Sequence, residues 1–312
     1  MTLQKVLRPL LVTTLLASAT MTAGCNRNRQ DAILRANEAD KMRKADREGA
    51  IAKLEEATRL DPSNHHIWYK LSAVYREKED WPKMAEALGN AIAADEKTKD
   101  DGTWATYYAE RGYALEQQAK KDKAKYEEAK APYLKCIELD ANYGDCYHQL
   151  GNVYLWTDDE QKALEYYTKA IEHDPKELRY YAPLADLYLA LGYTKEAEAV
   201  LKEGKAQAAP NDKLLWGIHV RMAEVLMDRG DMQSAATELE AAKAIPTGEG
   251  PESILILYSL GGVYAELNRG QEAKELLKGF YLRACRGAKA KDFVNECEVA
   301  KTRVVALGGT LQ

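Results

Sequence analysis

Residue patterns that carry out catalysis or hold a cofactor are absent from this sequence. There is no H-E-x-x-H zinc motif, no phosphate-binding loop, no G-x-G-x-x-G and no G-x-S-x-G nucleophile turn. His65 and His66 stand side by side at an expected helix start, where adjacent side chains point in different directions. Asp158 and Asp159 fall between two expected helices and suit turn and capping roles better than an acid–base pair. The sequence predicts no enzyme, no catalytic residue, no metal and no cofactor.

The N-terminus has the composition of a targeting segment. Lys5 and Arg8 provide a positive start, and residues 10–19 form an apolar run that is too short to be a membrane-spanning helix. We therefore expect residues 1–24 to act as a signal peptide.

A lipidated cysteine is expected directly after this segment. Ala23 and Gly24 lead into Cys25, which resembles the bacterial lipobox, although Thr22 stands where the motif usually has Leu. The resemblance implies a lipoprotein with acyl chains such as palmitate on Cys25, and several chains on one residue give stable anchoring. Asn26, rather than Asp, then implies the outer membrane, with the chain on its periplasmic face. The alternative is an ordinary secretory signal, with Cys25 free or disulfide-bonded.

Four further cysteines suit an exported protein. Cys136 and Cys146 lie on either side of an expected turn at residues 141–142, and Cys285 and Cys297 flank the turn into the last expected helix. In an oxidising compartment these positions predict two local disulfides among three possible pairings. The alternative is that all four are small buried apolar residues.

Side-chain size recurs along the chain with a fixed period. Residues 143–175 read as two helices with bulky and small residues on one face of each: Tyr147, Leu150, Gly151, Tyr154, Ala163, Tyr167 and Ala170. The same size classes return 34 residues later, at Tyr181, Leu184, Ala185, Tyr188, Ala197, Leu201 and Gly204. This pattern resembles the tetratricopeptide repeat, whose period is 34 residues.

The resemblance extends over nearly the whole mature chain. It implies an all-α, right-handed superhelix of about seven helix-turn-helix repeats, with the first repeat degenerate and the third lengthened around a polar run at residues 117–130. We expect a short tether over residues 25–30, the repeat array over 31–288, and a capping helix and tail over 289–312.

Composition excludes some partners. The formal net charge is −5, and removing Lys5 and Arg8 with the signal makes the mature chain −7. An acidic chain of this kind gives no support to nucleic-acid binding. No small-molecule substrate is expected either.

Protein or peptide partners in the cell envelope are the expected ligands. In the repeat family, set positions of each first helix face a groove; here they are Tyr69, Arg76, Tyr113, His148, Asn152, Leu155, Arg179, Asp186, Leu189, Glu224, Met227 and Tyr258. This mixture suits an extended peptide or a helix held by Asn152 and Arg179. The alternative for each residue is packing between neighbouring repeats. Only Asn152 matches the family's carboxylate clamp, so recognition of a free C-terminus is not predicted.

The repeat fold does not by itself specify a function, because one fold serves many roles. The sequence favours a lipid-anchored scaffold in the periplasm, similar in plan to pilotin-type lipoproteins, that assists assembly of a type IV pilus, a secretin or a motility apparatus. The alternatives are a regulatory adaptor of peptidoglycan hydrolases or of outer-membrane protein insertion. An enzyme subunit and a purely structural oligomer are weaker candidates.

Overall fold

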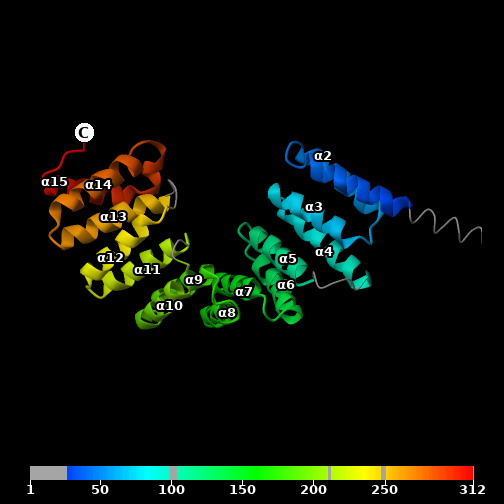
Figure 1. Ribbon diagram of the computed structural model, residues 1–312, viewed down its shortest axis with the longest axis horizontal. Coiled ribbons are helices and arrows are strands. Elements are labelled where there is room, and N and C mark those ends of the chain that lie inside the picture. Colours follow the sequence, from blue (N-terminus) through cyan, green and yellow to red (C-terminus); the bar gives the residue numbers. More distant parts are fainter. Residues whose placement is uncertain (1–26, 99–103, 210–211, 247–250, 312) are drawn as a thin grey trace, which may run out of the picture. The chain divides into compact units, whose positions relative to one another are not determined.

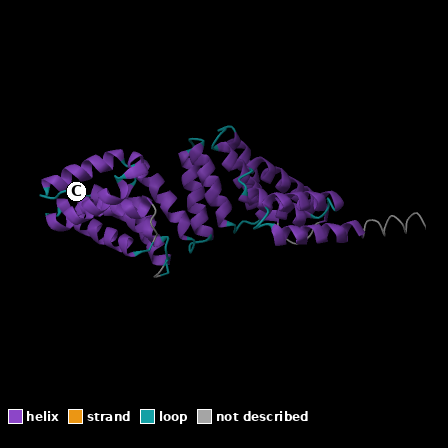
Figure 2. Ribbon diagram, turned by 90° about the horizontal axis from the view of Figure 1, so that it is seen from above, coloured by secondary structure: helices purple, strands orange, loops and turns teal. Residues whose placement is uncertain are grey.

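The structure is a computed structural model that describes residues 27–98, 104–209, 212–246 and 251–311. These residues form antiparallel helix pairs joined by short turns, and they contain no strand (Figures 1 and 2). A first helix over residues 27–42 is followed by α2 (Arg47–Leu60), α3 (His65–Glu77), α4 (Trp81–Thr98), α5 (Trp104–Ala119), α6 (Lys125–Leu139), α7 (Gly144–Trp156), α8 (Glu160–His173), α9 (Tyr181–Ala190), α10 (Thr194–Gln207), α11 (Leu215–Asp228), α12 (Met232–Ala244), α13 (Pro251–Glu266), α14 (Gly270–Ala284) and α15 (Val294–Ala306). The described part of the chain therefore holds the expected helix pairs and the additional last helix.

The chain divides into two compact units. The N-terminal unit ends at Ala163, within α8, and the C-terminal unit begins at Leu164. Each unit buries its own row of apolar side chains between successive helices. None of the helices in the described ranges is long and apolar enough to cross a membrane.

Several inter-helix turns use one residue with positive φ. Gly192 and Gly230 have φ of 79°, and Glu79, Asp158 and Asn268 have φ between 56° and 59° at matching turns of other repeats. A left-handed residue lets the chain leave one helix and enter the next within a few residues. At the turn into α8, Asp159 accepts a hydrogen bond from the backbone N–H of Lys162 at 3.1 Å. Asp158 and Asp159 thus have the turn and cap roles that the sequence indicated.

Small residues sit where the two helices of a repeat cross. A Cβ atom placed on Gly112 would lie 2.7 Å from the Tyr133 ring, and one placed on Gly261 would lie 2.8 Å from Leu277. Tyr133 and Leu277 are both essentially inaccessible to solvent. The recurrence of small and large residues in the sequence is therefore the recurrence of this crossing.

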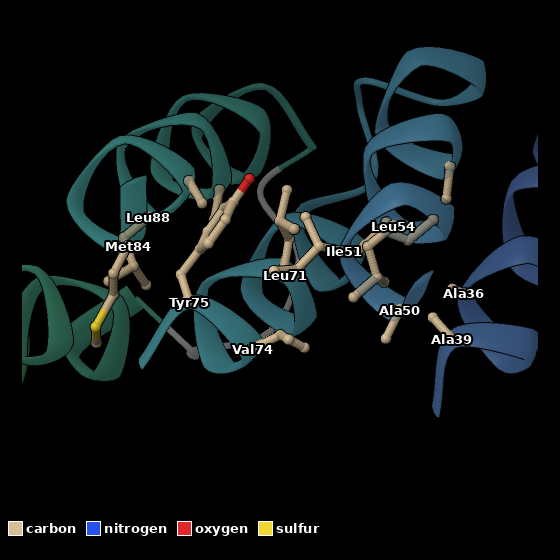
Figure 3. Packing of buried hydrophobic residues seen from close by; sticks show 14 of the residues in the cluster. Ala36, Ala39, Ala50, Ile51, Leu54, Leu71, Val74, Tyr75, Met84 and Leu88 are labelled. Carbon is tan, nitrogen blue, oxygen red and sulfur yellow. The ribbon is translucent and has the colours of Figure 1, made fainter. Parts of the chain in front are cut away.

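The first helix packs more completely than its residues suggested. Ala32, Ala36 and Ala39 are buried at spacings of four and three, and they belong to the same core cluster as α2 (Figure 3). Ala50 of α2 lies beside this alanine face, and Ile51 lies on the side of α2 next to Leu71. The degenerate first repeat thus keeps an intact crossing, because small side chains allow close approach as well as a Leu/Gly/Tyr stripe does.

The lengthened third repeat is two long helices. α5 has 16 residues and α6 has 15, and the polar run forms their adjoining ends. Glu116 is buried there and accepts a hydrogen bond from the Tyr133 hydroxyl at 3.0 Å. Burial raises the pKa of Glu116 despite that bond. This end of the hairpin is consequently not wholly solvated.

Two disulfides join neighbouring helices. Cys136 at the end of α6 is bonded to Cys146 at the start of α7, and both residues are fully buried. Cys285 at the end of α14 is bonded to Cys297 of α15 and is partly exposed. These are the two local pairings named from the sequence.

The last helix covers the end of the final repeat. Phe293, Ala300 and Val304 are buried against Phe280 and Leu277 of α14. A short 3-10 segment, η2 (Gly287–Asp292), carries the chain from α14 to α15. The helix therefore performs the capping role expected of it.

Candidate protein-binding surface

In the N-terminal unit, two of the expected groove residues bind each other. Arg76 of α3 lies 2.8 Å from Glu110 of α5, and its guanidinium lies 5.0 Å from the centre of the Tyr113 ring. Tyr113 in turn meets the edge of Trp81, with ring centroids 5.8 Å apart. Arg76 belongs to the second repeat and Glu110 to the third, 34 residues further along the chain. Arg76 and Tyr113 therefore tie one repeat to the next.

Tyr69 has a similar role. Its ring lies 5.0 Å from that of Tyr107, which is buried. Tyr107 also meets His65 through a 2.8 Å contact between its hydroxyl and Nδ1. Partial burial, followed by the charge of Glu110, raises the pKa of Tyr69. This aromatic group is part of the packing between α3 and α5.

The three expected groove residues of α7 lie on the half-buried side of that helix. Asn152 donates from Nδ2 to Oε1 of Gln149 at 2.7 Å, and His148 and Leu155 are half-buried. The Asn152 amide is thus engaged within its own helix.

Arg179 does not lie on an α-helix, contrary to expectation. It belongs to a 3-10 turn, η1 (Leu178–Tyr180), that precedes the short helix α9. Pro183 has no N–H to donate to the carbonyl group of residue 179, so Arg179 lacks the hydrogen bond that would join it to the α-helix. Its Nη2 donates to Glu177 at 2.9 Å. Arg179 is also in the other compact unit from Asn152.

Asp186 of α9 forms a two-pronged ion pair with Arg221 of α11. Arg221 donates from Nε at 2.5 Å and from Nη2 at 2.8 Å, across a separation of 35 residues. Glu224, on the exposed side of α11, has a raised pKa because partial loss of hydration and the charges of Asp186 and Asp228 outweigh Arg221. Leu189, further along α9, is half-buried. The Asp186–Arg221 pair is a second tie between successive repeats.

Met227 and Tyr258 have a different setting. Both line one pocket of about 280 Å³ in the C-terminal unit, to which α11, α12, α13 and α15 contribute. Met232 and Val263 complete its apolar wall. The Tyr258 ring rests on buried Phe280, with ring centroids 5.2 Å apart. The structure brings these two expected groove residues together beside open space.

The capping helix supplies the charge at this pocket. Arg303 of α15 and Glu266 of α13 line it, and the two groups lie 3.8 Å apart with both side chains substantially exposed. Gly262 leaves room for the guanidinium, since a Cβ atom there would lie 3.0 Å from Arg303 Nη1. The pocket thus has an apolar wall and an exposed cation at one side.

Such a pocket can accept an apolar side chain whose neighbouring carboxylate or carbonyl group meets Arg303. Methionine side chains adapt to varied shapes, which suits peptide recognition. Arginine binds planar oxygen groups through paired N–H donors. The sequence patterns missed Met232, Val263, Glu266 and Arg303. None of them stands at a groove position of a first helix, and only the fold brings them to the pocket.

Metal chemistry receives no support from the described residues. No group of three or more His, Cys, Asp or Glu residues within those ranges could hold a metal ion. The rings of His65 and His66 lie 3.9 Å apart, but His65 is buried and His66 is exposed.

Repeated antiparallel helix hairpins define a helical-repeat protein. Family models described as tetratricopeptide repeat match residues 118–143 and 144–177. The chain belongs to the tetratricopeptide repeat superfamily. Members of this superfamily mediate protein–protein interactions, and such scaffolds are generally not catalysts.

Solved structures agree on the fold. The C-terminal part of a tetratricopeptide-repeat protein from Cytophaga hutchinsonii has a TM-score of 0.60 at 16% identity, covering 82% of this chain and 98% of that one. PilF from Pseudomonas aeruginosa has a TM-score of 0.53 at 18% identity, covering 77% and 99%. A curated relative, a DnaJ subfamily C member 3 homolog from Dictyostelium discoideum, is 26% identical over 229 residues, 65% of this chain. The match spans only 45% of that relative's length.

Proposed function

We propose that this protein is a lipid-anchored adaptor that binds a partner protein through the pocket formed by α11, α12, α13 and α15. The observation that carries the binding proposal is the meeting of Met227 and Tyr258 beside open space with Arg303 at its side. At the corresponding face of the N-terminal unit, Arg76 and Tyr113 are occupied by each other. The proposed partner segment therefore carries an apolar side chain next to an oxygen-bearing group.

The proposed location is the periplasmic face of the outer membrane. Support comes from the run of residues from Lys5 to Cys25, which lies outside the described part of the structure. The two disulfides add support, since such bonds persist in oxidising compartments. Anchored there, the adaptor would assist assembly of an envelope machine such as a type IV pilus, a secretin or a motility apparatus.

Two measurements test these two parts separately. Replacing Cys25 with Ala should move the protein from the membrane fraction to the soluble periplasmic fraction; a variant that stays in the membrane fraction would refute the lipid anchor. This outcome does not depend on partner binding.

The pocket is tested by site-specific photo-cross-linking in intact cells. A photoreactive residue at position 227 should give a discrete adduct with the partner, which mass spectrometry then identifies. The matched control places it at Leu282, an exposed apolar residue of α14 that does not line the pocket. Equal adducts at both positions, or none at 227, would contradict the pocket assignment. The identity of the adduct decides among pilus or secretin proteins, peptidoglycan hydrolases and outer-membrane insertion factors.

A further inference from the structure

The outer face of the capping helix α15 carries an exposed valine near each end. Val294 is 63% exposed and Val305 is 61% exposed. Between them, Glu298 and Lys301 are also exposed. At 100° per residue these four positions fall within about 60° of the helix circumference, so they form one stripe about 17 Å long. We call this the α15 stripe.

The α15 stripe lies apart from the surfaces already described. Ala300 and Val304 point into the core, and Arg303 lines the pocket. Among the described residues, neither Glu298 nor Lys301 takes part in an ion pair. Two exposed β-branched side chains at the ends of a stripe leave apolar surface in water, which costs free energy unless another surface covers it.

The order of residues along the stripe is self-complementary. Suppose that a second α15 lies antiparallel to the first, with a two-fold axis passing between residues 299 and 300. Val294 then faces Val305 of the second copy, and Glu298 faces Lys301. The symmetry repeats each contact, which gives two apolar contacts at the ends and two ion pairs in the middle. A two-fold interface requires a surface that matches itself in this way.

We infer that the α15 stripe is a homodimer contact, in which two copies of this chain pair through antiparallel α15 helices. The four positions 294, 298, 301 and 305 are four, three and four residues apart, which is the spacing of positions that meet along paired helices. A contact made by one 13-residue helix is at the small end of protein interfaces, so the dimer is weak and forms in proportion to local concentration. This pairing leaves Arg303 and the pocket uncovered, and it does not depend on the proposed adaptor function.

The experiment uses charge reversal in the full chain. Two differently tagged copies are co-expressed, solubilised and captured through one tag, and the amount of the second tag is measured. Glu298→Lys in both copies places ammonium groups opposite each other, and Lys301→Glu in both copies places carboxylates opposite each other. Each should lower co-capture roughly tenfold, since two exposed ion pairs become two repulsions.

The decisive arms combine these changes. Co-expression of a Glu298→Lys copy with a Lys301→Glu copy restores opposite charges at both contacts, so co-capture should return to near the starting value. The double variant Glu298→Lys/Lys301→Glu should likewise pair with itself. Glu203→Lys on α10 controls for a general effect of charge, and should leave co-capture unchanged. Helix content measured by circular dichroism checks that each variant is folded.

Retained co-capture in both single variants, or failure of the mixed pair to recover, would overturn the inference. Sharing of a lipid patch or micelle cannot mimic the expected pattern, because it would not distinguish the single variants from their mixture. If the stripe instead binds a different protein, co-capture of the two tagged copies should be unchanged in every variant. Unchanged co-capture would therefore also refute the homodimer.

Discussion

The first helices of the two compact units differ in what their exposed faces do. In the N-terminal unit, Arg76 of α3 reaches Glu110 and Tyr113 of α5, so the side chains of successive repeats satisfy each other. In the C-terminal unit, Met227 and Tyr258 occupy the matching region without such a partner and leave a pocket beside them. Long charged and aromatic side chains can bridge neighbouring repeats, whereas a thioether cannot pair with a charge. At these positions the repeat therefore yields paired side chains in one unit and a pocket in the other.

The largest expected effect comes from removing the Phe280 ring, which packs beneath Tyr258 of the pocket. Phe280 is fully buried, and its ring lies 5.2 Å from Tyr258 and 6.0 Å from Phe293. Phe280→Ala should lower the stability of the C-terminal unit by about 3–5 kcal/mol, because a large cavity replaces the ring. Hydrogen exchange of amides in α13 and α14 measures this without treating the chain as a single two-state system. Amides of α3 and α4 should keep their protection, and equal loss in both units would contradict the division.

One half-buried and one buried carboxylate, Glu238 and Glu116, should give the units opposite responses to pH. Burial raises the pKa of Glu238, but hydrogen bonds from His219 and Lys205 outweigh it and hold the pKa below its ordinary value of 4.5. The folded C-terminal unit therefore gains stability from this group above pH 4.5 and loses it as the pH falls through the lowered value. Glu116 in the N-terminal unit has a pKa raised by burial, so its contribution is lost as the pH rises from 4.5 through the raised value.

Replacing each carboxylate with an amide compares its contribution to the stability of its own unit. At pH 7, Glu238→Gln should destabilise the C-terminal unit by about 1–3 kcal/mol, because it leaves partly buried cations without their partner. Glu116→Gln should leave the N-terminal unit equally stable or make it more stable at the same pH, since a buried charge is removed. Hydrogen exchange in α10–α12 and in α5–α6, recorded at pH 7 and at a pH below 4.5, measures the stability of both units. Changes of the same sign in the two units would show that the surrounding charges have been assigned wrongly.

A pair of matched lysine substitutions tests which of the two units binds the partner. Met227 and Leu155 are both half-buried on first helices, one beside the pocket and one in the other unit. Met227→Lys should lower partner binding at least about tenfold, because it places a second cation beside Arg303 in an apolar pocket, whereas Leu155→Lys should change it little. Binding is measured with the partner identified by cross-linking. A greater loss with Leu155→Lys would move the site to the N-terminal unit.

The smallest expected effect concerns the contacts of Arg76 with Glu110 and Tyr113 in the N-terminal unit. Arg76→Ala removes a half-exposed ion pair and a cation–π contact, so it should cost less than about 1 kcal/mol of stability in the N-terminal unit. Raising the salt concentration should lower the wild-type value towards that of the variant. Thermal unfolding at low and high salt provides the measurement. If Arg76→Ala instead abolished partner binding at unchanged stability, the N-terminal face would be the docking surface.

Much of the fold followed from local rules. Gly112 opposite Tyr133 shows why, since a crossing of two helices needs a small residue wherever the opposing residue is large. That requirement repeats every 34 residues and is visible in the order of the amino acids. The first repeat was less clear because Ala32, Ala36 and Ala39 satisfy the same requirement without any bulky marker.

The residues of the candidate site were predicted from the sequence less completely than the fold was. Met227 and Tyr258 were named from their repeat positions, but Arg76, Tyr113 and Asp186 were named by the same rule and prove to bind neighbouring repeats. Repeat position states which way a side chain points. It does not state whether the residue 34 positions away can reach it with an opposite charge or a ring.

The sequence alone determined the helix pairs, their turns, their number and the capping helix, because each depends on residues close together along the chain. It also indicated both local disulfides, since each closes a single turn between adjacent helices. Only the tertiary structure decided that Arg303 of the last helix joins Met227 of α11 at one pocket, 76 residues apart. That contact depends on which side chains of separate repeats pair with one another. A short-range periodic pattern in the sequence does not specify this pairing.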